Sequence, residues 1–443
     1  MESEWSRLRI DQVAEKVAMG PFGSSIKVST FVPIGVPVIS GQHLHGTRLE
    51  DSKYNFITPE HAEKLKNANV YRGDVIFTHA GNIGQVAYIP PCSKYDRYVI
   101  SQRQFFMRCN KTLIKPSFVT YYFKTHEGQH KLLANSSPSG VPSIAQPVTY
   151  LRSIEIPVPP LLVQEAIACI LGAFDDKIEL NRRMNRTLEE MAQAIFKSWF
   201  VDFDPVRAKA DGRDTGLPSE IADLFPDGFE ESEMGEIPKG WSSTSFTDSI
   251  EVIGGGTPKR SSSEYWGGSI PWFSVVDTPA DGEVFAISTK QTVTQLGIDN
   301  SSARILPVGT TIISARGTVG NLALVGVPMA MNQSCYGLRD QRNLKGYFLY
   351  FATEAVVDTL RQRGHGSVFN TITRDTLHSL RVASPPDEVA SAFERVVQSL
   401  MLRLLVSQQE SRTLAALRDS LLPKLISGEL RVPDAERIAE RVV

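Results

Sequence analysis

The sequence predicts an α+β protein with two pseudo-symmetric globular domains separated by two long antiparallel helices that form a coiled coil. Three observations lead to this prediction. Apolar residues recur about every 3.5 positions between Leu161 and Phe200, and a stretch near the C-terminus repeats the pattern. The two stretches match position for position at an offset of 226 residues. The segments that precede them also repeat, which is typical of a duplicated unit.

Each predicted helix has a heptad seam with a polar centre. The first seam consists of Leu171, Phe174, Ile178, Asn181, Asn185, Leu188, Ala192, Ile195 and Trp199. The second consists of Val397, Leu400, Leu404, Ser407, Ser411, Leu414, Arg418, Leu421 and Leu425. Pro159-Pro160 and Pro385-Pro386 precede the two helices, and proline suits a helix start because its missing N–H would have no partner there.

The matching polar centres favour packing of the two helices on each other. In an antiparallel pair Asn181 faces Ser411 and Asn185 faces Ser407, which would satisfy these buried groups and fix the register. The alternative is two unrelated amphipathic helices in separate cores, which the shared spacing disfavours. At ~1.5 Å per residue, each helix is ~60 Å long, which is enough for a spacer.

The chain alternates globular and helical segments. The first globular domain covers residues 1–158, with strands expected at Val75–Thr78, Gln85–Ile89 and Gln104–Arg108, a helix at Ser117–Leu133 and a closing strand at Ser153–Val158. The second covers residues 240–385, with a helix at Tyr347–Gln362 and a closing strand at Ser379–Ala383. Trp5 matches Trp241 and Gly20 matches Gly256, both at an offset of 236. The other segments are the helices 159–200 and 386–427, a Pro- and Gly-rich linker 201–239 and a tail 428–443.

The charge is distributed unevenly along the chain. The net charge is −2, yet residues 1–158 hold 18 Lys and Arg against 12 Asp and Glu, a net of +6. Residues 239–386 hold 13 against 11, a net of +2, which is also compatible with ordinary surface charge. Residues 159–238 hold 8 against 17, a net of −9. A local basic face can bind phosphates although the whole chain is nearly neutral.

The sequence contains no defensible catalytic or metal-binding motif. The four cysteines have no CxxC spacing, and His43 and His45 lack a third ligand. Gly254–Lys259 lacks the Gly-Lys-Ser/Thr ending of a phosphate loop. No catalytic residue, metal or cofactor is therefore expected on this chain. With no apolar stretch of ~18 residues and a charged N-terminus, a cytoplasmic location is expected.

Each globular domain is rich in polar loops with Gly, Ser, Asn, Gln and Arg. Such side chains read base edges, while Lys and backbone amides hold phosphates, and two equivalent sets are stronger evidence than one. The candidate DNA-binding residues are Lys27, Arg48, His79, Asn82, Gln102, Arg103, Lys259, Arg260, Ser274, Arg316, Thr318, Asn332, Gln333, Arg363 and His365.

Two stretches at the helix ends resemble a known family. Phe196–Val206 (FKSWFVDFDPV) is similar to the central conserved region of the specificity subunits of type I restriction–modification systems. Leu417–Val432 (LRDSLLPKLISGELRV) is similar to their distal conserved region. Gly255-Gly256-Thr257-Pro258 resembles the opening of many of their recognition domains, whereas Gly20-Pro21-Phe22-Gly23 departs from that form. The resemblance covers nearly the whole chain.

The resemblance implies two target recognition domains that each read half of a bipartite double-stranded DNA site. It also implies two methyltransferase subunits, together with restriction subunits, as partners, which would carry S-adenosylmethionine, ATP and Mg. The candidate partner-binding residues are Trp199, Phe200, Phe203 and Asp204. Trp199 lies on the helix seam and could simply pack there, whereas Phe200 and Phe203 do not lie on it.

Two other functions remain open. A scaffold or protein-interaction module with degenerate recognition domains would have the same layout, and salt-dependent binding to a specific duplex would distinguish it. A methyltransferase or nuclease in its own right is disfavoured because its motifs are missing: Ser384-Pro385-Pro386 is followed by Asp387 and not by an aromatic residue.

Overall fold

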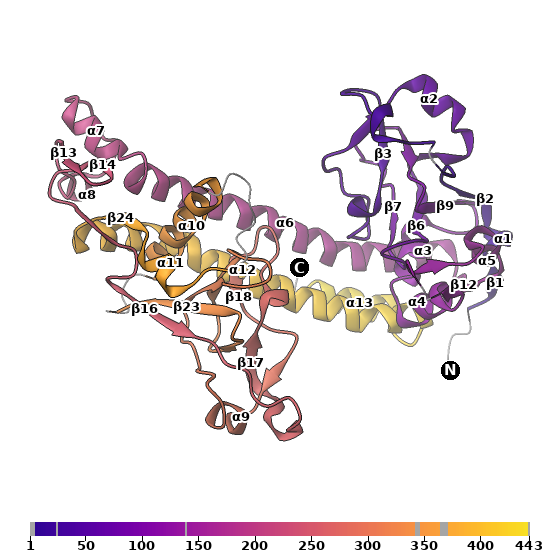
Figure 1. Cartoon of the computed structure of the whole chain (residues 1–443). Helices are drawn as coiled ribbons and strands as arrows, with labels where there is room; N and C mark the ends of the chain where they lie inside the picture. The colour runs from indigo at the N-terminus through magenta and orange to yellow at the C-terminus, as the bar shows by residue number, and fades with distance from the viewer. Residues whose placement is uncertain (1–4, 24, 138–139, 342–345, 364–370, 442–443) are drawn as a thin grey trace. The chain divides into compact units, whose positions relative to one another are not determined.

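The computed structural model describes residues 5–441 except 24, 138–139, 342–345 and 364–370. The chain forms two compact units. The first unit consists of Met1–Ile178 and Thr413–Val443, and the second unit is Glu179–Arg412. Each contains β-sheets, shorter helices and part of both long helices (Figure 1), which confirms the predicted α+β class. None of the helices within the described ranges combines the length and apolar character that a bilayer span requires.

The two long helices lie where the sequence predicts them. Helix α6 is Leu161–Phe200 and helix α12 is Asp387–Ser427, and each follows its Pro-Pro pair. Both helices are shared between the units, because α6 continues from the first unit into the second and α12 from the second into the first. In the second unit the rings of Phe196 and Phe393 lie 5.6 Å apart. Asn181, earlier in α6, lies beside Glu410, later in α12, so the helices are antiparallel there, as predicted. In the first unit Asp175 of α6 pairs with Arg418 of α12 at 2.6 Å.

The seam is apolar in each unit but incompletely paired at its polar centre. Asn181 Nδ2 donates to Glu410 Oε2 at 2.9 Å and not to the predicted Ser411. Asn185 Oδ1 and Ser407 Oγ are buried and have no hydrogen-bond partner among the described residues. The prediction that these groups satisfy each other is therefore wrong. Leaving a polar atom buried and unpaired costs ~1–3 kcal/mol.

The first unit is built around two four-stranded sheets. The main sheet has the antiparallel order β2 (Ala14–Met19), β9 (Gln104–Cys109), β6 (Asp74–Thr78), β7 (Val86–Tyr88). The second sheet has the order β4 (Asn55–Ile57), β3 (Val36–Ile39), β8 (Arg97–Ile100), β5 (Asn69–Tyr71), and in it β3 and β8 are parallel. Two further pairs are β1 (Arg7–Arg9) with β12 (Glu155–Pro157) and β10 (Ser136–Ser137) with β11 (Ser143–Ile144).

The short helices of the first unit differ from the prediction in one respect. They are α1 (Ile10–Val13), α2 (Pro59–Lys64), α3 (Pro116–Tyr122), α4 (His126–Leu133), α5 (Pro147–Ser153) and α13 (Val432–Ala439). The single helix predicted at Ser117–Leu133 is two helices, α3 and α4, because Thr125 caps α4 by accepting from Gly128 N at 3.0 Å. Helix α13, which lies in the predicted tail, packs with buried Ala435 and Ala439 against the core of the first unit.

The second unit repeats the topology of the first. Its main sheet has the order β16 (Ile250–Gly254), β23 (Cys335–Asp340), β20 (Thr311–Ser314), β21 (Leu322–Val325), β18 (Phe285–Ala286). The smaller sheet has the order β19 (Thr292–Val293), β17 (Trp266–Phe273), β22 (Ala330–Met331), with β17 and β22 parallel like β3 and β8. Strand β15 (Ser242–Ser245) pairs with β24 (Arg381–Ser384), as β1 does with β12. The predicted internal repeat is confirmed.

The remaining elements of the second unit include the acidic linker, which is largely ordered. They are α7 (Asp204–Ala210), α8 (Ser219–Ala222), the hairpin β13 (Phe229–Ser232) with β14 (Gly235–Pro238), α9 (Gln295–Asp299), α10 (Gly346–Arg363) and α11 (Arg374–His378). Val206 and Phe225 of the linker are buried against Trp199 and the other aromatics of the second unit's core. Aromatic burial thus holds this Pro- and Gly-rich segment in place.

Candidate nucleic-acid interface

Two loops of the first unit meet at one end of its main sheet. The backbone N–H of His79, directly after β6, donates to the carbonyl oxygen of Arg103 at 2.9 Å. His79 Nε2 lies 3.0 Å from the carbonyl oxygen of Gln102. Ile144 of β11 joins them, because its N–H donates to the carbonyl oxygen of His79 at 2.8 Å. The structure therefore brings His79, Gln102 and Arg103 together, and Asn82 is exposed in the same loop as His79.

The His79 ring is neutral near pH 7. Desolvation lowers the pKa of His79, and the hydrogen bond to the Gln102 carbonyl opposes this only in part. A carbonyl oxygen can only accept, so Nε2 carries the proton and Nδ1 is the acceptor of the ring. Such a ring can accept from the amino group of an adenine or a cytosine, which is the chemistry of base-edge reading.

The second unit builds the equivalent edge from β20 and the turn between β22 and β23. The Arg316 N–H donates to the carbonyl oxygen of Ser334 at 3.2 Å, which joins the loop after β20 to this turn. Thr257 Oγ1 donates to Gln333 Oε1, which adds the glycine loop after β16. The predicted residues on this edge are Arg316, Thr318, Asn332 and Gln333. Sequence reasoning missed Thr257, although it stands in the Gly-Gly-Thr-Pro stretch.

Glycines allow the backbone to approach these turns closely. A Cβ at Gly255 would lie 1.8 Å from the carbonyl oxygen of Asn332, and one at Gly20 would lie 2.0 Å from that of Ser101. Any other residue would clash with the backbone of the turn. The two turns are equivalent, so the structural counterpart of Gly20 is Gly255. The sequence comparison had matched Gly20 with Gly256, and that match is wrong.

Arg260 is held on an aromatic platform in the second unit. Its guanidinium carbon lies 4.5 Å from the ring centroid of Trp266 and 5.3 Å from that of Trp272. Its Nη1 donates to Gln291 Oε1 at 3.1 Å, and the neighbouring Lys259 is exposed. Cation–π contacts restrain the side chain without neutralising its charge, which suits a phosphate or base contact. The two tryptophans were the available sequence signal for this platform, and sequence reasoning did not use them.

Other predicted DNA-binding residues lie outside these edges. Lys27 is exposed in a loop that precedes β3. Ser274 Oγ donates to Asp277 Oδ2 at 2.7 Å, which is a local capping contact. Arg363 is the last residue of α10, and His365 lies outside the described residues.

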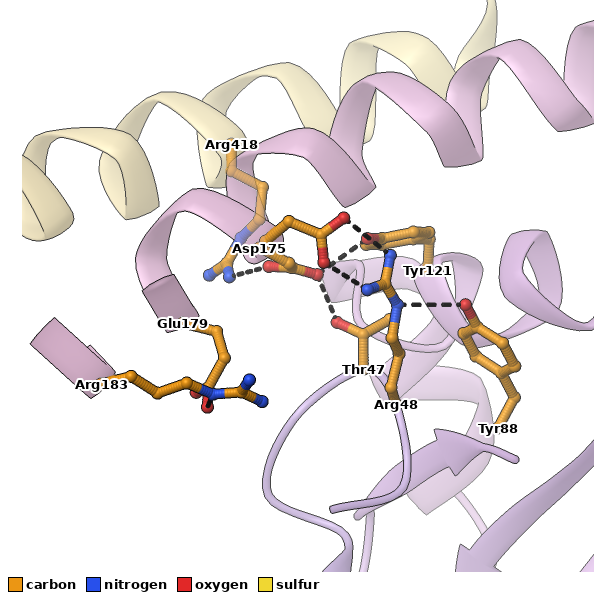
Figure 2. A network of polar contacts seen from close by, with 9 residues as sticks. Thr47, Arg48, Tyr88, Tyr121, Asp175, Glu179, Arg183 and Arg418 are labelled. Atoms are coloured by element: carbon orange, nitrogen blue, oxygen red, sulfur yellow. Dashed lines mark hydrogen bonds and ion pairs between the residues drawn. The ribbon is translucent and has the colours of Figure 1, made fainter. Parts of the chain in front are cut away.

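Arg48 points toward helix α6 (Figure 2). There it pairs with Asp176. Its Nε also donates to the hydroxyl of Tyr88 on β7 at 3.3 Å. The side chain thus has partners inside the first unit, and its predicted contact with DNA stays a prediction. Local sequence reasoning had no signal for a pairing across 128 residues.

The predicted partner-binding aromatics are mostly buried in the second unit. Trp199 is 3% exposed and Phe200 is 9% exposed. The Phe200 ring lies 5.4 Å from that of Phe393 on α12, so Phe200 packs against the second helix although it is not on the heptad seam. The view that only Trp199 has a packing role is therefore wrong.

Phe203 and Asp204 lie at the start of α7, after α6 ends. Phe203 has a left-handed backbone, with φ of 55°, and its ring is 5.6 Å from that of Trp241. Asp204 is exposed. Phe200 and Phe203 also line a cavity of about 480 Å³ between the end of α6, α10 and strands β15 and β24. Among the described residues, no group of three His, Cys, Asp or Glu side chains could hold a metal ion.

Comparison with known proteins gives consistent matches along the chain. The family described as type I restriction modification DNA specificity domain matches residues 2–190 and 238–403. The type I restriction enzyme HindI specificity subunit of Haemophilus influenzae is 27% identical over 405 residues, which covers 82% of this chain and 87% of that protein. The MjaIX specificity subunit of Methanocaldococcus jannaschii is 25% identical over 368 residues, which covers 82% of this chain and 79% of that protein.

The fold also has a counterpart among solved structures. The crystal structure of the type I restriction–modification system S subunit from M. genitalium matches with a TM-score of 0.55. The match covers 95% of this chain and 96% of that one at 16% sequence identity. At this identity the likeness concerns the fold alone.

Proposed function

Because the chain belongs to the family of type I restriction–modification DNA specificity domains, we propose that it reads a bipartite double-stranded DNA target. In this proposal each globular domain reads one half-site, and the helices α6 and α12 set the number of unread base pairs between them. Methyltransferase subunits dock on the helix ends that resemble the family's conserved regions, and restriction subunits join that core. The chain itself supplies no catalytic group, while S-adenosylmethionine, ATP and Mg act on the partner subunits.

The observation that carries the proposal is the pair of equivalent polar edges. Each is formed at the same place of an equivalent sheet, after β6 and before β9 in the first unit, and after β20 and before β23 in the second. Each presents side chains of the types that can hydrogen-bond base edges, with Gln102 and Arg103 in one edge and Gln333 and Arg316 in the other. A duplicated reading edge fits a target with two halves.

Charge supports the same proposal. The first domain has a net charge of +6, and its exposed cations include Lys27 and Arg103. In the second domain Lys259 and Arg260 stand together beside the tryptophan platform. Cations of this kind neutralise phosphates and make binding depend on salt.

Two measurements test the proposed function together. Methylome sequencing of cells with and without the gene identifies the target, and titration of the assembled complex with that duplex at several salt concentrations measures its recognition. We expect one bipartite methylated motif that disappears with the gene, and salt-dependent binding that prefers this motif. A scaffold with degenerate recognition domains would leave the methylome unchanged and bind no duplex selectively.

We expect Gln333→Ala to relax recognition in one half-site. An exposed amide that hydrogen-bonds a base edge contributes ~1–3 kcal/mol of discrimination at that base pair, so affinity for the native duplex falls while affinity for duplexes changed at that position does not. Arg316→Ala should behave in the same way. Lys259→Ala is the matched control for a phosphate contact, because it should lower the affinity for all duplexes by the same factor. An equal loss of affinity for all duplexes in Gln333→Ala would instead show that Gln333 contacts the DNA backbone.

We expect Phe203→Ser to reduce co-purification with a methyltransferase subunit while the chain stays folded. Phe203 is partly exposed beside the charged Asp204, and an aromatic anchor with a charged rim is a common interface pattern. Phe200→Ser cannot test docking, because removing a buried phenyl ring costs ~3–5 kcal/mol of stability. Phe22→Ser, at a phenylalanine that is 76% exposed in the first unit, is the matched control. If Phe203→Ser co-purified with the methyltransferase subunit as well as the wild type does, Phe203 would not belong to the docking site.

A further inference from the structure

One carboxylate of helix α6 connects three other parts of the first unit (Figure 2). Asp175 Oδ2 accepts hydrogen bonds from the hydroxyls of Thr47 and Tyr121, each at 2.7 Å. Asp175 Oδ1 accepts from Arg418 Nη1 of helix α12 at 2.6 Å. A single side chain of α6 thus holds the loop that contains Thr47, helix α3 and helix α12.

The surroundings of Asp175 make these contacts strong and directional. Its side chain is 17% exposed, and Thr47 and Tyr121 are buried. Desolvation, followed by the charge of Asp175, raises the pKa of Tyr121, so its hydroxyl remains a donor over the physiological range. Hydrogen bonds to an ionised carboxylate are shorter and about twice as strong as neutral ones.

The next residue along α6 continues the same attachment. Asp176 pairs with both Nη atoms of Arg48. Gly172 provides the room, since a Cβ at that position would lie 3.3 Å from Arg48 Nη2. Helix α6 therefore holds two adjacent residues of one loop, Thr47 and Arg48, through two adjacent carboxylates.

Hydrogen bonds connect this loop to the predicted reading edge, which is the end of the first unit's main sheet that holds His79, Gln102 and Arg103. Arg48 forms a parallel β-bridge with Tyr88 on β7, and the Tyr88 N–H donates to the carbonyl oxygen of Thr47 at 3.1 Å. Strand β7 pairs with β6, and His79 follows β6 directly. A continuous path of hydrogen bonds thus runs from α6 through the loop and two strands to the edge that holds His79.

The second unit attaches the equivalent segment by an amide and by charged groups. Phe285 of β18 pairs in parallel with Leu324 of β21, as Arg48 does with Tyr88. Its N–H donates to Gln408 Oε1 at 3.2 Å, and its carbonyl oxygen accepts from Gln408 Nε2 at 2.9 Å. Arg412 of α12 also donates to the carbonyl oxygen of Ile287 at 3.3 Å, and Arg186 of α6 pairs with Asp281. Both domains are therefore attached to the long helices through the segment that pairs with β7 or with β21. The first is attached by carboxylates of α6, and the second by Gln408, Arg412 and Arg186.

We infer that Asp175 is a positioning residue, which fixes the orientation of the first recognition domain on the helices and thereby restricts the spacer lengths that the protein accepts. The inference rests on the proposed function. Its physical basis is that a rigid attachment makes a reading edge meet its bases at one distance and angle only. A loosened attachment lets the edge reach bases one pair further or nearer, so discrimination between spacers falls while the bases preferred in each half-site stay the same.

Asp175→Asn, in the full chain assembled with its methyltransferase subunits, tests the inference. The readout is the ratio of affinities for duplexes with the native spacer and with one base pair more or fewer. We expect this ratio to fall by about tenfold, as the loss of one charge-assisted bond predicts. Thr47→Val should lower the ratio in the same direction without removing a charge, and Thr47→Ser, which keeps the hydroxyl, should restore it. Asp211→Asn, at an exposed carboxylate of the linker paired with Arg213, is the control for lost charge.

The possible outcomes separate the inference from the proposed function. If the wild-type complex prefers no duplex, the proposed function is wrong. If the wild type is selective, and Thr47→Val and Asp175→Asn keep its spacer ratio while their melting temperatures fall, the network serves stability alone and the inference is overturned. If Asp175→Asn does not fold, Thr47→Val with its Thr47→Ser rescue decides by the same ratio.

Discussion

Exchanging residues 240–384 for the equivalent domain of a relative is expected to change one half of the DNA target and to leave the other half unchanged. The exchange joins the chain where the structure permits it, because Ser242 of β15 lies opposite Ser384 of β24 in an antiparallel pair. The domain therefore enters and leaves at one place, and a new domain with the same closing pair can be inserted without altering α6 or α12. This exchange should have the largest effect on specificity of any change in the chain.

The measurement is the methylome of cells that carry the exchanged gene. One half of the methylated motif should be new, and the other half and the spacer should be those of the parent. The donor domain must keep the contacts that hold it to the helices, such as the pairing of the strand equivalent to β18 with Gln408. A change in both half-sites would contradict the modular assignment.

Insertion of four residues after Arg183 in α6 is expected to lengthen the unread spacer. Four residues are about one helical turn and add ~6 Å, which is nearly two base pairs at a rise of ~3.4 Å. The spacer should increase by one or two base pairs while both half-sites remain the same. Because the helices are antiparallel and Asn181 lies beside Glu410, a second insertion of four residues after Gln409 should preserve the seam.

The measurement for the insertion is again the methylated motif, with the single and the double insertion compared. A control inserts four residues beside Gly212, in an exposed part of the linker with open space around it, which leaves both helices at their length. That control should keep the native spacer. A changed half-site with an unchanged spacer in the helix variants would show that the helices do not set the distance.

The helices were the most predictable part of the fold. Their seams depend on a period within one segment, and the predicted bounds Leu161–Phe200 agree with the structure. The break at Thr125 was not predicted, although the apolar pattern stops at Phe123 and resumes only at Leu132, and threonine is a favourable residue at a helix start. A Cβ at Gly128 would lie 2.1 Å from the carbonyl oxygen of Tyr122, so tertiary packing and a threonine cap decide where the second helix begins. Helix α13 has the common proline at its start, a signal that sequence reasoning did not use.

The candidate site was predictable in its residue types and only partly in its geometry. His79 and Gln102 were selected as polar loop residues, and the strand order that brings their loops together could not be derived from one sequence. The same limit applies to Asp175, because its partners are 54 to 243 residues away in the chain. The pairing of Asn185 with Ser407 failed for a different reason: facing positions on a seam share a level, but hydrogen bonding also requires the correct distance and rotamers.

The division of the chain between the two units also determines the order in which it can fold during synthesis. The second unit is one continuous segment, Glu179–Arg412, so all of its core is available before Thr413–Val443 is made. The first unit contains Met1–Ile178, which is made earlier, but it also needs Thr413–Val443, because Leu414, Leu421 and Ala435 belong to its core. Until they emerge from the ribosome, Leu171 and Phe174 lack their seam partners and expose apolar surface. The domain that is translated first is therefore completed last. A prematurely terminated chain leaves the first unit incompletely folded and therefore accessible to proteases.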